Sequence, residues 1–243
     1  MKPCRFAAPL LAALFAVPAS ADATDRLADL QAAYRDPSAV TYTADVEFYS
    51  VDGRWETVNT TTYAVRWDPQ GPDLRLSHPS FDLSWDGAEL LATSSELRGR
   101  ALIAETPADA EWAELVEAFP PLGTMLPLPD LALALAADPA AVIGDADTTT
   151  VEAEADAAVR ITGEQTATLT PDPTTGRLST AVTESSPAFG VPVRVTHTFA
   201  EAEEGDAAQA VADRLAPIET DPQAMAIAAT FDDWINGPAR PGA

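Results

Sequence analysis

Apolar and polar residues alternate along much of the chain between Val40 and Glu105, and this pattern predicts a run of β-strands. The first strand shows a period of two, with Val40, Tyr42 and Phe48 among the apolar residues of one face. Turn sequences typical of hairpins, such as Asp52-Gly53 and Asp86-Gly87, separate the strands. A meander of this kind must curl to bury one face, so we expect a curved sheet with an inside. The predicted strands are Val40–Tyr49, Arg54–Trp67, Leu74–Ser77, Phe81–Trp85, Glu89–Ser94 and Arg100–Glu105.

The second strand changes phase along its length. Val58 is out of phase both with Trp55 and with Tyr63 and Trp67, which predicts a β-bulge or bend near Asn59–Thr62.

Helical patterns flank this first group of strands. Asp25–Tyr34 is amphipathic and ends before Pro37. After Glu105, Thr106-Pro107 predicts a helix start with threonine as N-cap, and the helix extends to about Ala118, where Pro120-Pro121 stops it. An apolar loop over Leu122–Leu128 leads to a further helix, Asp130–Ala137, which Asp138-Pro139 ends.

Strand patterns then return, with a turn expected at Asp172–Gly176. The order of strands, helices and strands predicts a mainly β (α+β) fold, in which helices pack against one side of an antiparallel sheet. The tail adds an expected helix at Pro222–Ile235. The later predicted strands are Thr148–Ala153, Ala157–Gly163, Gln165–Pro171, Arg177–Glu184 and Val191–Ala202.

The first 21 residues have the features of a secretory signal. Lys2 and Arg5 precede a short apolar run, and small residues up to Ala21 form a cleavage site. We expect cleavage after Ala21, with Ala23 as the second choice, and a periplasmic or secreted mature protein. No later segment is long and apolar enough to be an integral membrane span. The one cysteine, Cys4, precedes the apolar run, so we expect neither a lipid anchor nor a disulfide.

Charge argues against some partners. The chain has 14 basic and 38 acidic residues, and loss of Lys2 and Arg5 leaves a formal charge of −26. Such a surface repels nucleic acid and anionic membranes, so we expect no nucleic-acid partner. The acidic residues are scattered, which is typical of solvation.

The sequence shows no arrangement that indicates catalysis. His78 and His197 each stand alone in strand-like segments, without the spacing of metal ligands. The chain has no nucleophile elbow and no phosphate-binding glycine loop, so we expect no catalytic residues, no metal and no cofactor. Gly53-Arg54-Trp55 matches a lipocalin G-x-W element, but a full strand already precedes it here.

Apolar side chains offer a more informative pattern. Large residues lie on consecutive predicted strands, and the apolar stretch Leu122–Leu135 is suited to cover their face. This arrangement fits either an ordinary core or a cavity for an apolar ligand. The candidate ligand-binding residues are Trp55, Trp67, Phe81, Trp85 and Leu91 on the sheet, with Leu126, Leu131 and Leu135 as the cover.

The order of elements resembles that of LolA/LolB-like periplasmic carriers and their uncharacterised periplasmic relatives, over about Asp25–Ala202. The similar segments are Val40–Phe48, Thr62–Pro69, Leu74–Leu76, Leu83–Leu91, Ala158–Gly163, Leu169–Leu178 and Val193–Phe199. The resemblance implies an unclosed antiparallel β half-barrel wrapped around helices, with an apolar concave face that holds lipoprotein acyl chains in the carriers. The chain departs from the carriers in its few basic residues and its proline-rich central region.

Two functional hypotheses follow. The first is a non-enzymatic periplasmic carrier that holds a lipid, a lipidated peptide or another apolar ligand in the half-barrel. The second is an interaction or sensor domain on the same fold, with an envelope protein as partner and no lipid. We expect residues 1–21 to be the signal peptide, 22–202 the half-barrel domain, and 203–243 an acidic, alanine-rich, partly helical segment with a frayed end.

Overall fold

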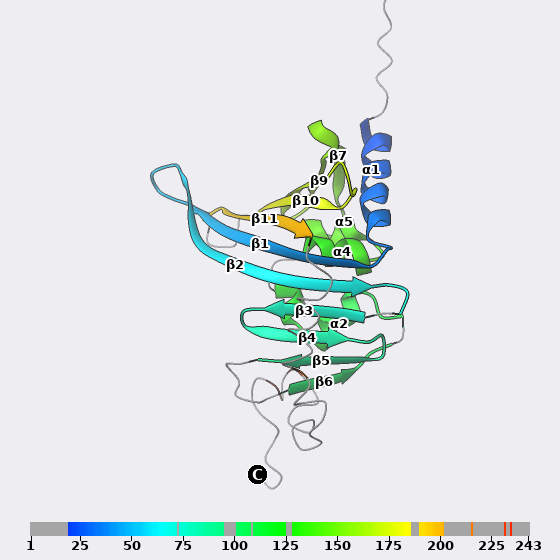
Figure 1. Cartoon of the computed structure of the whole chain (residues 1–243). Helices are drawn as coiled ribbons and strands as arrows, with labels where there is room; N and C mark the ends of the chain where they lie inside the picture. The colour runs from blue at the N-terminus through cyan, green and yellow to red at the C-terminus, as the bar shows by residue number, and fades with distance from the viewer. Residues whose placement is uncertain are drawn as a thin grey trace, which may run out of the picture.

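The computed structural model describes residues 19–71, 73–94, 101–107, 109–124, 128–185 and 190–201, together with Leu215, Phe231 and Trp234. The described strands form one antiparallel sheet in the order β6-β5-β4-β3-β2-β1-β11-β10-β9-β8-β7 (Figure 1). They are β1 (Ser38–Tyr49), β2 (Trp55–Asp68), β3 (Asp73–His78), β4 (Phe81–Trp85), β5 (Glu89–Thr93), β6 (Ala101–Glu105), β7 (Thr150–Ala153), β8 (Val159–Thr162), β9 (Thr166–Pro171), β10 (Leu178–Ser185) and β11 (Val193–Glu201).

The sheet consists of two meanders that meet at one pair of strands. β1 to β6 follow one another across one half and β7 to β11 across the other, and the register between β1 and β11 runs from Val40↔Glu201 to Phe48↔Val193. The outer strands β6 and β7 do not pair with each other, so the sheet is not closed. The predicted class, a mainly β (α+β) fold with an unclosed antiparallel sheet and helices on one side, is confirmed.

Five α-helices and one short 3₁₀ helix complete the described part of the chain. They are α1 (Ala19–Ala33), α2 (Trp112–Ala118), α3 (Pro121–Thr124), α4 (Pro129–Leu135), α5 (Pro139–Gly144) and η1 (Ala155–Ala157). Buried residues of α1, α2, α4 and α5 share a single core with alternate residues of the strands. We call the side of the sheet that carries this core the inner face.

The strand predictions are confirmed to within a few residues, and β4 begins and ends where the pattern placed it. The predicted irregularity in the second strand is a bulge that shifts the register between Val46 and Glu47. These two residues face Asn59 and Thr57, so Val58 is the extra residue of β2.

Two of the helix predictions were wrong in detail. α2 does not begin at Thr106, because Glu111 caps it and exchanges hydrogen bonds with Glu114 in a capping box. The Thr106 hydroxyl instead accepts a hydrogen bond from Trp85 Nε1 at 2.7 Å. Asp138-Pro139 does more than end α4: the Asp138 carboxylate accepts the Ala141 N–H at 3.1 Å and starts α5, which the sequence did not predict.

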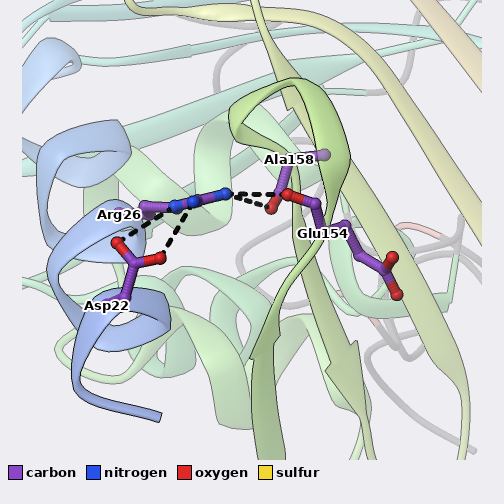
Figure 2. Close-up of polar contacts among 4 residues, drawn as sticks. All are labelled: Asp22, Arg26, Glu154 and Ala158. Atoms are coloured by element: carbon purple, nitrogen blue, oxygen red, sulfur yellow. Dashed lines mark hydrogen bonds and ion pairs between the residues drawn. The ribbon is translucent and has the colours of Figure 1, made fainter. Parts of the chain in front are cut away.

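α1 begins at Ala19, ahead of its predicted start, and is attached to two connections of the second meander, β7–β8 and β9–β10. Near its start, the Arg26 guanidinium pairs with Asp22 at 2.9 Å and donates to the carbonyls of Glu154 and Ala158, as Figure 2 shows. At the C-terminal end of α1 and just after it, the carbonyls of residues 33, 36 and 37 accept hydrogen bonds from the Arg177 guanidinium at 2.7–3.3 Å. These contacts hold α1 across the β7 side of the sheet (Figure 1).

Candidate functional site

A continuous row of ring side chains crosses the inner face at right angles to the strands. Strand register explains it, because Tyr42 on β1 faces Phe199 on one side and Tyr63 on the other, and His78 faces Phe81. Neighbouring ring centroids lie 4.8–5.0 Å apart along the row. We call this set the aromatic row: Phe199, Tyr42, Tyr63, His78, Phe81 and Phe119.

Two aromatic residues from the C-terminal part of the chain meet the far end of the row. The rings of Phe231 and Trp234 lie 5.9 and 5.3 Å from the ring of Phe119, and both pack against the main core. The other end of the row, at Phe199, lies beside a hollow at the surface.

This hollow has a volume of about 360 Å³ and lies where β1 begins, β11 ends and the β9–β10 turn approaches them. Its apolar lining includes Val40, Leu178 and Phe199, and its polar lining includes Asp172 and Glu201. The turn is rigid, because the Asp172 carboxylate accepts the N–H groups of residues 174 and 175, which also lowers its pKa. Ligand pockets in proteins start near this volume.

Several polar atoms are buried near the row without a hydrogen-bond partner in the described part of the chain. They are Asp130 Oδ1 at the start of α4, the Tyr42 hydroxyl, His197 Nδ1 and Trp67 Nε1. A buried polar group left unpaired costs about 1–3 kcal/mol, so a natural core retains few of them.

Burial changes the acid–base properties of this region. Desolvation raises the pKa of Asp130 from 3.8 to about 7, against hydrogen bonds from its own N–H and that of Leu131, which lower the pKa. Burial likewise lowers the pKa of His78 and of His197 to about 4, so both rings are neutral near pH 7. The pKa of Tyr42 is raised by burial and also by the nearby Asp130 charge.

The structure brings together only some of the predicted ligand-binding residues. Trp67, Phe81, Trp85 and Leu131 are buried in the main core, with Trp67 stacked on Trp85 at 5.8 Å, and the partly buried Leu135 packs against that core. Their side chains are at most 5% exposed, Leu135 apart, which describes a packed interior at these positions.

Trp55 and Leu91 do not share that face. Trp55 lies at the distant end of the β1–β2 hairpin, where its ring contacts Tyr49 and the Arg194 guanidinium. Leu91 belongs to a separate cluster with Ala101 and Leu215, because alternate residues of β5 point to opposite faces. The expectation of one shared face for the whole set is corrected accordingly. Leu126 lies outside the described residues.

Sequence reasoning missed the residues that give the site its character. Tyr42 and Tyr63 were assigned only to strand alternation, and His78 and His197 were interpreted as ordinary strand residues. The alternating pattern could have identified them, because each lies an even number of positions from the apolar residues of its strand. Such residues are expected on the inner face of the sheet. Asp130 carried no signal, because an acid after a proline at a helix start is normally solvent-exposed.

The described residues of the site give little indication of a catalytic or metal-binding group. Among the described residues, no three of the His, Cys, Asp and Glu side chains gather in a way that would hold a metal ion. None of the described helices combines the length and the apolar character needed to cross a membrane. Fold and site together define an unclosed β half-barrel whose inner face carries aromatic rings and ends at a surface hollow.

Comparison with known proteins gives similar folds at low identity. A LolA superfamily protein from Nitrosomonas europaea is 8% identical, with a TM-score of 0.37, and the match covers 74% of this chain and 94% of that protein. MucB is 17% identical with a TM-score of 0.38, over 78% of this chain and 62% of MucB. The MucA/MucB complex from Pseudomonas aeruginosa gives 16% identity and a TM-score of 0.33, over 75% of this chain and 59% of the matched chain.

This chain thus spans less than two thirds of the MucB chains that it matches. No protein-family model matches the sequence, and neither does any curated protein.

Proposed function

We propose that the protein is a non-enzymatic periplasmic binding protein that holds an apolar ligand on the inner face of its half-barrel. The aromatic row carries the proposal, because it leads from the hollow at Phe199 into the interior. Trp67, Phe81, Trp85, Leu131 and Leu135 lie in the core beside the row and would contact the ligand. Burial of an alkyl chain contributes about 0.8 kcal/mol per methylene, which requires apolar lining and no catalytic group.

The construction of the interior supports entry of a ligand. The sheet is extensive, whereas the helices that cover its inner face are short. Those that follow β6 and precede β7 in the sequence are 4–7 residues long. Helices this short have little stability of their own and keep their place through side-chain packing. Moving these helices outward therefore requires less free energy than distorting the sheet. Contacts with the ligand would replace the lost contacts between the helices and the sheet.

Native mass spectrometry of gently purified protein tests the proposal, together with titration by 1-decanol and decanoate. Because Trp67 and Trp85 lie in the core, binding should change the intrinsic fluorescence. Phe199→Ser should weaken binding of both compounds, whereas the control Phe48→Ser, at a 41% exposed position on the hairpin, should not. Ligand-free protein that binds neither compound would rule the proposal out.

A second function is favoured by a separate observation, an apolar patch at the free end of the β1–β2 hairpin. This hairpin projects beyond the neighbouring strands (Figure 1). In the described part of the chain, the exposed large apolar residues lie on this hairpin or at the β10–β11 connection beside it. We call them the hairpin patch: Phe48, Tyr49, Val51, Val58 and Val191.

The alternative function is an envelope interaction domain that binds a protein segment through the hairpin patch. Glu47, Asp52 and Glu56 flank the patch together with one exposed basic residue, Arg54, whereas Arg194 is paired with Glu184 at 2.6 Å. Acidic groups therefore outnumber basic ones, and the matching segment has apolar side chains with a net basic flank. A photo-reactive group at position 51 should cross-link to one such segment. Phe48→Glu should abolish the cross-link, and Asp147→Asn, at an exposed turn far along the chain, should preserve it. Cross-linking unaffected by Phe48→Glu would contradict this function.

A further inference from the structure

Three of the unpaired buried polar atoms lie on elements that converge behind the hollow. Asp130 is on α4, Tyr42 on β1 and His197 on β11, and their side chains are 1–2% exposed. The Tyr42 ring lies 5.7 Å from the His197 ring, and the Asp130 charge acts on the Tyr42 hydroxyl. Unpaired polar atoms from separate elements in one region form a set that a bound molecule with hydrogen-bonding groups would satisfy.

The hollow leads directly to this set. Phe199 lines the hollow, and its ring lies 5.0 Å from the ring of Tyr42. Leu178 lines it too, and its N–H donates to the hydroxyl of Tyr34, which also experiences the Asp130 charge. A ligand that displaces the Phe199 ring therefore reaches Tyr42, whose hydroxyl is influenced by the Asp130 charge.

The charge in this region is suited to a cation. None of the ion pairs in the described residues involves Asp130. Arg177, which is the nearby cation acting on Tyr34, is engaged with three backbone carbonyls. The other groups that face Asp130 are the hydroxyls of Tyr34 and Tyr42, and His197 nearby is neutral near pH 7. The hollow is lined by two acids, Asp172 and Glu201, and by the one basic residue Arg177, so acidic groups outnumber basic ones at the entrance.

Aromatic rings complete the arrangement. The rings of Tyr42 and Tyr63 stack at 4.9 Å, and the ring of Phe199 tilts against Tyr42. Aromatic faces attract organic ammonium groups, and this attraction is strongest where water is excluded.

We propose that the ligand is an organic cation, an alkyl or aryl amine, whose ammonium group binds Asp130 and the Tyr42 hydroxyl while its apolar body lies along the aromatic row. The inference rests on the proposed function and specifies the class of ligand. Ionised Asp130 is the counter-ion, and the rings of Tyr42 and Tyr63 provide the π-surface. The seven-residue helix α4 shifts outward to admit the ligand.

The test compares decylamine, decanoate and 1-decanol, which share one chain and differ in the head group. Fluorescence titration and calorimetry at about pH 8 should give decylamine an affinity at least about tenfold higher than that of decanoate, as a charge-assisted hydrogen bond implies. Asp130→Asn should remove most of the preference for decylamine over decanoate and over 1-decanol. Asp147→Asn, at an exposed turn, is the matched control and should leave both unchanged.

A pH series separates binding by Asp130 from binding at the acidic entrance. Decylamine stays protonated over the range, as a lysine ammonium does, whereas Asp130 loses its charge below about pH 7. The affinity of the wild-type protein for decylamine should therefore fall from about pH 8 to about pH 5, whereas that of Asp130→Asn should stay level. Equal affinity for the three compounds, or a preference unaffected by Asp130→Asn, overturns the inference and leaves the proposed function standing. Failure of all three to bind overturns the proposed function itself.

Discussion

Asp130 lies in an environment that an aspartate rarely occupies, because it is buried and its pKa is raised. A carboxylate that is 2% exposed and has an oxygen without a partner among the described residues is stable there only when it is protonated. The raised pKa, about 7, places that change of charge near neutral pH. Ionisation of Asp130 thus destabilises the packed core around it.

We predict that Asp130→Asn removes a pH dependence from stability. The folded protein holds the Asp130 proton up to about pH 7, whereas the unfolded chain releases it near 3.8, so the free energy of unfolding falls as pH rises between these values. The slope is about 1.4 kcal/mol per pH unit, and the total is on the order of 4 kcal/mol. Urea unfolding of both proteins between about pH 4 and about pH 8 should show a growing difference in favour of Asp130→Asn.

The comparison also controls for His197, whose lowered pKa has the opposite effect: stability falls as pH drops from 6.5 towards about 4. Both proteins contain His197, so its contribution cancels in the difference. Parallel pH profiles for the two proteins would show that Asp130 does not titrate in this way.

The hydrogen bond from Trp85 Nε1 to the Thr106 hydroxyl provides a second prediction for single residues. Trp85 is 2% exposed, so Thr106→Val leaves a buried indole N–H unpaired and should cost about 1–3 kcal/mol. The free energy of unfolding in urea measures this cost. Thr175→Val, at an exposed turn, is the control, and an equal effect of both substitutions would contradict the assigned bond.

Among the elements, α5 and the β8–β9 turn approach each other so closely that the turn requires glycine at Gly163, and the segment before β7 leaves no room for a side chain at Gly144. A Cβ on Gly163 would collide with the Gly144 carbonyl oxygen, and a Cβ on Gly144 would lie 2.6 Å from Thr149 Cγ2. Gln165 adds two hydrogen bonds, from its side chain to the Ile143 carbonyl at 2.8 Å and from its backbone to the Gly144 carbonyl. α5 is thus fixed to the sheet by backbone contact as well as by its apolar side chains.

Gly163→Ala should therefore destabilise the protein by about 1–3 kcal/mol through overpacking. Gly71→Ala is the matched control, because no atom lies within 4 Å of a Cβ placed there. Thermal unfolding of the two variants measures the difference. A Gly163→Ala protein as stable as Gly71→Ala would show that α5 and the turn lie further apart.

The attachment of α1 gives another prediction for an element. Arg177→Ala removes the donors to three carbonyls at the end of α1, so hydrogen exchange in α1 should rise while exchange in β3 and β4 stays unchanged. Arg160 is paired only loosely with Glu154, at 3.8 Å and with both side chains largely exposed. Arg160→Ala should have little effect, and equal exchange in both variants would argue against the Arg177 contacts.

The sequence was a good guide to the strands and a poorer one to the helices, for physical reasons. Strand alternation and turn residues are local signals, and β4 with its Asp86-Gly87 turn was predicted in full. Asp138-Pro139 is compatible with both the end of one helix and the start of the next, so α5 was missed. The aromatic row depends on register between β1 and β11, which are distant in the chain and carry no mutual sequence signal.

For the whole molecule, the contacts of α1 favour Ala21 over Ala23 as the site of the signal cleavage that the sequence predicts. Ala23 is fully buried and Asp22 pairs with Arg26, so cleavage after Ala23 would remove both interactions. We predict a mature N-terminus at Asp22, which intact-mass measurement of secreted protein would show. A mature chain that begins at Thr24 would contradict this prediction.

The single join between β1 and β11 has a consequence for how the protein folds. β1 is the first of the described strands to be synthesised and β11 is the last of them, so one edge of β1 stays unpaired while the intervening chain is made. Contacts between such distant segments form slowly. Because Tyr42 and Phe199 lie on opposite sides of this join, the proposed binding site is completed only by the last strand. Ligand binding would then serve as a proofreading signal, since only a fully assembled sheet could acquire it.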